Sequence, residues 1–315
     1  MGKIAFLFSG QGSQYIGMGK DLYDHSTAAR ATFALADQEL GYPLSELCFS
    51  GPKEVLDLTE NTQPAILTVS IAAWKALAAS GVYPDVVAGF SLGEYSALVC
   101  SNMIDFQEAV KLVRKRGQFM QEAVPLGIGG MAAILGLETE KIEEACNLVC
   151  SKGVVQVANY NCPGQVVISG MKDALEAACI KAAEFGAKRV IPLEVSGPFH
   201  TGLLQPAAEK LAEELTKIVF KEPLFPVMSN VTAQEMKDSA EAVSLLPKQV
   251  KSPVLWETTI RKMLDTGVDT FVEIGPGSTL RGFVRKIERK ANLLNVENMS
   301  SLNATVEYFQ NRADQ

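Results

Sequence analysis

The chain has 315 residues, which is enough for one large domain or for a domain that carries an insertion. Its hydrophobic content of 47% and charged content of 21% are typical of a globular protein with a full core. The formal net charge of −7 argues against nucleic acid as the main partner, and no run of eighteen apolar residues predicts a membrane span.

The cysteines and the first residues of the chain bear on the cellular compartment. The six cysteines are scattered in apolar surroundings and no pair has the spacing of a metal site, so we expect reduced core thiols. The apolar run at residues 4–8 is too short for a signal peptide and predicts a first β-strand instead. We therefore expect a cytoplasmic protein with no bound metal.

The first strand is expected to be central in a sheet. Residues 4–8 are continuously apolar, which is typical of a parallel strand buried on both faces. Gly10 and Gly12 follow, and glycines in such a loop let the backbone approach a ligand closely, although a plain strand-to-helix connection is the alternative. The P-loop ending is absent. Helices are expected at residues 20–40 and 66–77, where apolar residues recur with the helical period.

Residues 89–93, Gly-Phe-Ser-Leu-Gly, match the G-x-S-x-G nucleophile elbow. A buried strand is predicted before them and a buried helix after them, which is the context that the motif requires. Ser91 would stand on a strained turn, with Gly89 and Gly93 beside it because a Cβ at either place would collide with the other arm of the turn. The backbone N–H of Leu92 would then donate to a developing oxyanion. By itself, the pattern also fits an ordinary strand-to-helix turn.

A second unit is predicted at residues 126–196. Strand patterns occur at 131–135, 154–159, 165–170 and 188–193, and helical patterns at 138–150 and 172–186. Residues 161–164, Asn-Cys-Pro-Gly, predict a hairpin turn. The order β-α-β-β-α-β is that of a ferredoxin-like unit. We therefore expect a small inserted domain between residues 1–125 and 197–315 of a larger domain.

After the insertion the chain carries His200, a helix that contains Leu211 and Leu215, and a buried strand at residues 270–274. A Gly-Pro-Gly turn ends that strand. The polar stretch after Met299 is expected to fray.

The only base candidates among histidines are His25 and His200. A serine hydroxyl is a poor nucleophile until a base takes its proton. His25 lies among polar residues and is expected at the surface, so His200 is the better partner for Ser91. The α/β-hydrolase order would place an acid between them, but Glu94 and Asp105 are close to the elbow in sequence. A backbone carbonyl is therefore expected to orient the histidine.

Four spaced motifs occur in one order along the chain. They are GQGSQ at residues 10–14, GFSLGE at 89–94, RGQFMQ at 116–121 and GPFH at 197–200. Together they resemble the malonyl-CoA:acyl carrier protein transacylase family, the stand-alone acyltransferases of bacterial fatty acid synthesis. The resemblance spans nearly the whole chain, as far as EIGPG at 273–277. It implies an α/β fold, with an α/β-hydrolase-like large domain around a parallel sheet and a ferredoxin-like insertion.

The resemblance also implies roles for individual residues. Ser91 would be the nucleophile that takes the malonyl group from coenzyme A, and His200 would be the general base and acid. The backbone carbonyl of Gln249 would steady the histidine in place of an aspartate. The backbone N–H groups of Gln11 and Leu92 would form the oxyanion hole.

By the same resemblance, Arg116 would bind the free malonyl carboxylate. A guanidinium makes two parallel charge-assisted hydrogen bonds to a carboxylate. With an acetyl group the buried guanidinium would stay unpaired, which a site rejects strongly. The alternative is a solvated charge at a helix end beside Arg114 and Lys115.

Further residues are expected around the acyl group. The resemblance suggests that Phe199 favours malonyl over methylmalonyl, because its ring would crowd an α-methyl group. Phe90 departs from the family pattern, where most members have histidine, and we expect a modest effect on rate or acyl choice. Asn159 and Asn161 resemble asparagines that line the cleft, although turn formation is the alternative.

The expected function is ping-pong transfer of malonyl from malonyl-CoA to the phosphopantetheine thiol of acyl carrier protein, by a monomer without metal or redox cofactor.

Acyl carrier proteins are acidic, so a local basic patch is expected on this chain. The candidates are Lys115, Lys188, Arg189, Lys286 and Arg289, each of which also fits a solvated face. The alternatives are an acyltransferase that serves a polyketide synthase, a serine esterase or thioesterase, and a non-catalytic module that binds acyl carrier protein.

Overall fold

The computed structural model describes residues 2–125, 127–195 and 197–313. The strands are β1 (Lys3–Phe8), β2 (Val86–Gly89), β3 (Gly129–Leu135), β4 (Val155–Cys162), β5 (Gln165–Met171), β6 (Arg189–Pro192), β7 (Val227–Met228), β8 (Val268–Ile274) and β9 (Asn292–Val296). The α-helices are α1 (Lys20–His25), α2 (Thr27–Leu40), α3 (Leu44–Ser50), α4 (Lys53–Leu56), α5 (Thr59–Ala78), α6 (Gly93–Cys100), α7 (Phe106–Ala123), α8 (Thr139–Leu148), α9 (Lys172–Glu184), α10 (Gln205–Leu215), α11 (Ser239–Lys251), α12 (Trp256–Asp265), α13 (Thr279–Ile287) and α14 (Met299–Ala313). Two short 3₁₀ turns, η1 (Cys150–Lys152) and η2 (Gly202–Leu204), complete the described elements.

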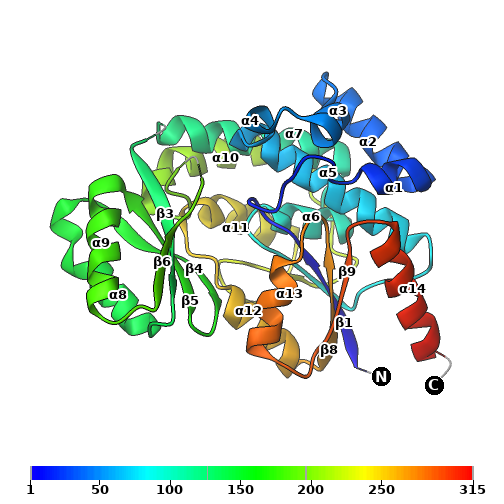
Figure 1. The fold of residues 1–315 in the computed structure, drawn as a ribbon. Helices are drawn as coiled ribbons and strands as arrows, with labels where there is room; N and C mark the ends of the chain where they lie inside the picture. The colour runs from blue at the N-terminus through cyan, green and yellow to red at the C-terminus, as the bar shows by residue number, and fades with distance from the viewer. Residues whose placement is uncertain (1, 126, 196, 314–315) are drawn as a thin grey trace.

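The larger sheet has the strand order β7-β2-β1-β8-β9, and all its described pairs are parallel. As expected, β1 is central and buried. Successive side chains of a strand point to opposite faces. Phe6 and Phe8 therefore join the core under α5, α6 and α7, while Ala5 and Leu7 join a second core with α12 and α13. Both faces of the sheet are thus covered by helices (Figure 1).

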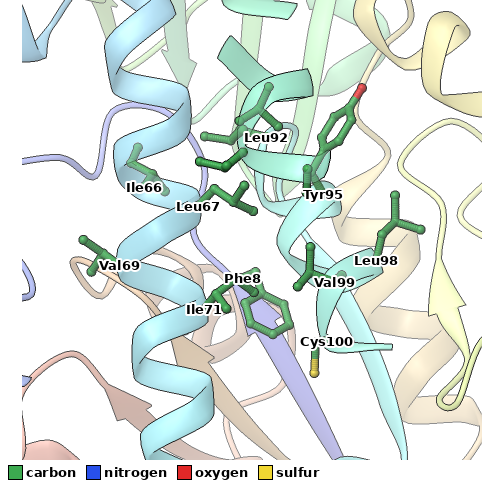
Figure 2. Close-up of a cluster of buried hydrophobic side chains, with 14 of the residues drawn as sticks. Phe8, Ile66, Leu67, Val69, Ile71, Leu92, Tyr95, Leu98, Val99 and Cys100 are labelled. Atoms are coloured by element: carbon green, nitrogen blue, oxygen red, sulfur yellow. The ribbon is translucent and has the colours of Figure 1, made fainter. Parts of the chain in front are cut away.

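Helices α5 and α6 pack together over β1, and this packing supports the elbow (Figure 2). Phe8 of β1 lies in the same cluster as Leu67 of α5 and Val99 of α6, and all three side chains are buried. Tyr95 points its hydroxyl group away from this cluster (Figure 2). Fully burying such apolar side chains contributes roughly 1.5–3 kcal/mol each.

The smaller sheet has the order β4-β5-β3-β6 and is antiparallel, with α8 and α9 on its outer side (Figure 1). The element order β3-α8-β4-β5-α9-β6 is the one that the sequence predicts. Leu126 and Ser196, the predicted ends of this unit, lie outside the described residues. The predicted turn at residues 161–164 is too long, because β4 runs on to Cys162 and only Pro163 and Gly164 turn.

The C-terminal stretch does not fray as predicted: Met299–Ala313 form helix α14, which packs against the large sheet's core. Leu302 is buried, and the apolar side chains of Val306 and Phe309 continue one helical face toward that core. Arg312 pairs with Asp269 at 3.0 Å. No helix in the described part of the chain is long and apolar enough to cross a bilayer.

Candidate active site

The elbow lies between β2 and α6, at the carboxyl end of the parallel sheet. Ser91 has a φ of +52°, a left-handed conformation that is strained for a residue with a Cβ. A Cβ on Gly89 would lie 1.8 Å from the backbone carbon of Gly93, across the turn as predicted. A Cβ on Gly93 would instead lie 2.2 Å from the carbonyl oxygen of Phe8 in β1. The second glycine is therefore required by the neighbouring strand.

His200 is in hydrogen-bond contact with Ser91. Its Nε2 lies 2.7 Å from Ser91 Oγ, and its Nδ1 lies 2.9 Å from the carbonyl oxygen of Gln249 and 3.1 Å from that of Ser252. Carbonyl oxygens only accept, so Nδ1 carries the proton and Nε2 is free to accept one. The carbonyl of Gln249 thus contacts the histidine, as predicted. The carbonyl of Ser252 also contacts it, which the sequence does not predict.

Burial keeps this imidazole neutral. Desolvation lowers the pKa of His200 from 6.5 to about 4, and the positive charge of Arg116 acts in the same direction. The two carbonyl contacts oppose the shift only in part. At neutral pH the ring can therefore take the Ser91 proton.

We expect the acid limb of kcat/KM against pH to have its midpoint near pH 4 rather than near 6.5. Protonated His200 cannot accept the Ser91 proton, so activity is lost as the pH falls through the lowered pKa of His200. Rates of acyl transfer measured at acidic to neutral pH give the midpoint. A midpoint at the ordinary histidine pKa would contradict the buried, neutral imidazole.

Two backbone N–H groups beside Ser91 are available to a ligand. Leu92 begins α6 as its N-cap, and Gln11 lies in the loop after β1. Within the described ranges, neither backbone N–H has a hydrogen-bond acceptor. The two loops are in contact, because a Cβ on Gly10 would lie 2.4 Å from the carbonyl oxygen of Phe90. Two backbone N–H groups without acceptors thus lie in loops that touch each other beside Ser91.

Arg116 lies behind Ser91, and the solvated alternative is wrong. Arg116 lies on α7 and is only 1% exposed. At the next residue, Gly117, helix α7 approaches α5 closely. Nη1 donates to Gln63 Oε1 at 2.8 Å, and Nη2 donates to Gln249 Oε1 at 2.9 Å and to Ser91 Oγ at 3.4 Å. Both amide partners are neutral, and no carboxylate of the described residues pairs directly with this guanidinium. An anionic group bound near Ser91 would therefore meet a buried cation that no carboxylate contacts directly.

The side chain of Asn230 holds the elbow backbone. Its Oδ1 accepts the backbone N–H of Ser91 at 2.7 Å, and its Nδ2 donates to the carbonyl of Gly89 at 2.7 Å. Glu94 Oε2 accepts from the backbone N–H of Asn230 at 3.1 Å and from Gln249 Nε2 at 3.0 Å. Gln249 Nε2 also donates to the carbonyl of Ser91 at 2.7 Å. The strained serine is thus fixed from both sides by side-chain amides.

The sequence does not predict the contacts of Asn230, Gln63 and the side chain of Gln249. A signal for Asn230 exists, since it lies two residues after the end of β7 and β7 pairs in parallel with β2. Residues at the carboxyl ends of neighbouring parallel strands meet at one edge of the sheet. Gln63 gives no comparable signal, because its contact depends on how α5 packs against α7.

We expect Asn230→Ala to lower kcat about 10²-fold with a smaller change in KM. The change leaves a buried N–H and a buried C=O without partners and lets the serine move, and a displacement of about 1 Å costs about that factor. Stability should fall by roughly 2–4 kcal/mol in urea unfolding. Asn147→Ala, at an exposed position on α8, is the control. An unchanged kcat would show that the elbow does not need this side chain.

The elbow opens into a cleft between the two sheets, with an empty volume of about 1010 Å³ that includes its open mouth. Predicted residues that line it are Gln11, Phe90, Ser91, Asn159, Asn161, Phe199 and His200. Asn159 and Asn161, both in β4, line the cleft, and Asn161 Oδ1 has no hydrogen-bond partner among the described residues. The Phe90 ring packs edge-on against Trp256, with centroids 5.4 Å apart.

The comparisons with known proteins place the chain among acyl transferases. Residues 5–312 match the family described as acyl transferase domain. The chain is 50% identical to the malonyl CoA-acyl carrier protein transacylase of Bacillus subtilis (strain 168), over 100% of this chain and 99% of the relative.

Two solved structures are also close. The malonyl CoA-acyl carrier protein transacylase of Clostridium perfringens has a TM-score of 0.95 and 48% identity, over 99% of this chain and 98% of that one. The malonyl-transacylase of the PlMCAT:AntF complex, solved with its type II PKS acyl-carrier protein, has a TM-score of 0.95 and 43% identity, over 97% and 99% of the two chains. This chain therefore belongs to the malonyl CoA-acyl carrier protein transacylase family of acyl transferases.

Proposed function

We propose that this enzyme transfers the malonyl group of malonyl-CoA to the phosphopantetheine thiol of acyl carrier protein, through a malonyl ester of Ser91. The observation that carries the proposal is the buried guanidinium of Arg116 at 3.4 Å from Ser91 Oγ, beside a serine that contacts a neutral histidine. A site built in this way favours an acyl group that ends in a carboxylate. The names of the relatives support the same substrate.

The first half of the reaction forms the acyl ester. Ser91 Oγ attacks the thioester carbonyl while His200 Nε2 takes its proton. The developing oxyanion accepts from the backbone N–H groups of Gln11 and Leu92. When the intermediate collapses, the C–S bond breaks and His200 gives the proton to the coenzyme A sulfur. Throughout, the carbonyls of Gln249 and Ser252 hold Nδ1–H.

The second half is the reverse process with a new thiol. His200 removes the proton of the phosphopantetheine thiol, whose sulfur attacks the ester carbonyl, and then returns the proton to Ser91 Oγ. Acyl transfer through a serine ester requires no metal or redox cofactor, and coenzyme A acts here only as the carrier that leaves. The carboxylate clamp at Arg116 fixes the acyl group so that the thiol, rather than water, reaches it.

Transfer and hydrolysis can be separated in one assay. We expect malonyl-CoA with holo acyl carrier protein to give mainly malonyl-acyl carrier protein, and little free malonate. Mass spectrometry of the carrier protein and quantification of malonate measure both products. Free malonate as the main product would favour the esterase or thioesterase alternative, and no consumption of malonyl-CoA would favour the binding module.

A role in polyketide synthesis is the second candidate, and a specific observation favours it. A malonyl-transacylase 43% identical to this chain was solved with a type II PKS acyl-carrier protein. The acyl-transfer chemistry is the same in both pathways. Transfer rates to fatty acid and polyketide carrier proteins would distinguish them, since the physiological partner should have the larger kcat/KM.

Acyl carrier protein would dock at the mouth of the cleft. Among the basic candidates, Lys286 on α13 donates to Gln165 at 3.2 Å, and Gln165 lines the cleft. Lys115 is a weaker candidate, because Glu214 pairs with it at 2.7 Å. An acidic partner at this edge would gain attraction that falls as the salt concentration rises.

We also propose a domain division, a role for Phe199, a cellular location and an oligomeric state. The parallel sheet with helices on both faces supports an α/β-hydrolase-like large domain at residues 1–125 and 197–315, and the β-α-β-β-α-β order supports a ferredoxin-like domain at 126–196. Phe199, 6% exposed beside His200, would restrict an α-methyl group. We place the enzyme in the cytoplasm as a monomer, in keeping with the resemblance.

A further inference from the structure

Glu94, in the first turn of α6, is a buried carboxyl group that the proposed reaction does not use. The residue is 0% exposed. Its Oε2 accepts from the backbone N–H of Asn230 and from Gln249 Nε2, whereas its Oε1 has no hydrogen-bond partner in the described part of the chain. A buried carboxylate is strongly unfavourable unless an opposite charge compensates it.

Arg116 can supply that charge through the amide of Gln249. The amide oxygen accepts from Arg116 Nη2 at 2.9 Å, and the amide nitrogen donates to Glu94 Oε2 at 3.0 Å. The amide dipole therefore has its negative end at the guanidinium and its positive end at the carboxyl group. Hydrogen bonds to ionised groups are the strong ones, so this relay is most stable with Arg116 charged and Glu94 ionised.

The other titratable groups around Glu94 add no charge. Burial raises the pKa of Tyr95, the next residue on α6, and its phenol is neutral. His200 is neutral because burial lowers its pKa. Asn230 and Gln249, from the segments packed against Glu94, have no ionisable side chain. Among the described residues in contact with Glu94 or next to it, the local charge thus depends on Arg116 and on Glu94 itself.

We propose that Glu94 is the counter-charge of Arg116 in the empty site and takes up a proton when a malonyl carboxylate reaches Arg116. This rests on the proposed function, because it requires a malonyl carboxylate at that guanidinium. With the malonyl carboxylate bound, an ionised Glu94 would leave two buried negative charges beside the one cation of Arg116. When Glu94 takes a proton from the buffer, one of these negative charges is removed. Burial already raises the pKa of Glu94 to about 7, so a second negative charge need raise it only moderately.

Glu94 thereby becomes a residue that determines acyl selectivity. Malonyl-CoA binding is coupled to proton uptake, so its affinity should fall up to about tenfold per pH unit above the empty-site pKa of Glu94. Acetyl-CoA adds no acyl carboxylate to the site, so the affinity for acetyl-CoA should not depend on whether Glu94 is protonated. The preference for malonyl over acetyl should therefore decrease as the pH rises.

Calorimetry of Ser91→Ala tests the proposal, because this variant binds malonyl-CoA without forming the ester. Binding heats in two buffers of different ionisation enthalpy give the number of protons taken up. At about pH 8 we expect up to about one proton per malonyl-CoA, and fewer at about pH 6, where Glu94 already holds its proton. Acetyl-CoA, which carries the same coenzyme A phosphates, should cause little uptake.

Two further variants assign the proton. Ser91→Ala with Glu94→Gln should take up none, and Ser91→Ala with Glu140→Gln, at an exposed position on α8, should behave as Ser91→Ala. Equal uptake after Glu94→Gln, or no difference between malonyl-CoA and acetyl-CoA, would overturn the proposal. If the Glu94→Gln protein does not fold, the pH dependence in Ser91→Ala decides. The proposal is then overturned if the number of protons taken up on malonyl-CoA binding does not decrease from about pH 8 to about pH 6.

The same binding measurements distinguish failure of the proposed function from failure of the proton-uptake inference alone. If Ser91→Ala binds malonyl-CoA no more tightly than acetyl-CoA at about pH 6, where Glu94 is protonated, Arg116 does not hold a carboxylate. The proposed function and the inference then fail together. Tight, selective binding of malonyl-CoA without proton uptake removes the inference alone.

Discussion

Ser91→Ala is expected to reduce malonyl transfer about 10⁴-fold or more, because the variant has no hydroxyl to form the acyl ester. The loss should appear in kcat, since the cleft and the Arg116 guanidinium remain to bind malonyl-CoA. Asn230 and Gln249 hold the elbow through the backbone N–H and C=O of residue 91, which alanine retains. The variant should therefore fold with nearly unchanged stability.

A transfer assay with holo acyl carrier protein, beside thermal unfolding, measures both parts of this expectation. Ser151→Ala, at an exposed position, is the matched control and should transfer at the wild-type rate. Transfer by Ser91→Ala within about tenfold of wild type would mean that the acyl group does not pass through this serine.

Arg116→Ala is expected to invert the acyl preference. The change removes two hydrogen bonds from an ionised group to the malonyl carboxylate, so kcat/KM for malonyl-CoA should fall about 10³-fold, or about 4 kcal/mol. Activity with acetyl-CoA should stay unchanged or rise, because the variant has no buried cation beside an acyl group that brings no carboxylate. Arg116→Lys should recover part of the malonyl activity, because an ammonium keeps the charge but loses the planar fork.

Initial rates with both acyl-CoA substrates measure this preference. Arg114→Ala is the control, because this arginine lies on the same helix but over the Tyr42 ring, with 4.4 Å from its guanidinium carbon to the ring centroid. An equal loss with malonyl-CoA and acetyl-CoA would show that Arg116 supports the structure of the site and not the recognition of the carboxylate.

The features that the sequence predicts correctly have local causes. The continuous apolar run of β1 marks a strand buried on both faces, and Gly89 is required because a Cβ there would lie 1.8 Å from the backbone carbon of Gly93 across the turn. The order of elements in the small sheet follows from alternating strand and helix patterns. These signals depend on neighbours along the chain, which a sequence displays.

The features that the sequence does not predict depend on tertiary packing. Asn230 is 139 residues from Ser91, and its role arises because the short strand β7 pairs with β2. Glu94 is close to the elbow in sequence, but its link to Arg116 exists only because α11 places Gln249 between them. No spacing rule along the chain predicts such a contact.

Two predictions are wrong because tertiary contacts override the local sequence pattern. The pair Pro163 and Gly164 makes a turn, but Asn161 before it remains in β4, whose register shifts between Tyr160 and Cys162. The polar C-terminal stretch forms α14, because a few apolar residues at helical spacing, including Leu302, are enough to pack the helix onto a preformed core. Tertiary contacts decide both cases.

The most direct test of the account is to find where the malonyl group resides on the protein. Brief incubation with malonyl-CoA, followed by intact-mass spectrometry and peptide mapping, gives the number and the position of adducts. We expect one malonyl group, on the peptide that contains Ser91, and its disappearance when holo acyl carrier protein is added. A malonyl group on another residue, or none on a protein that still transfers it, would contradict the serine-ester mechanism.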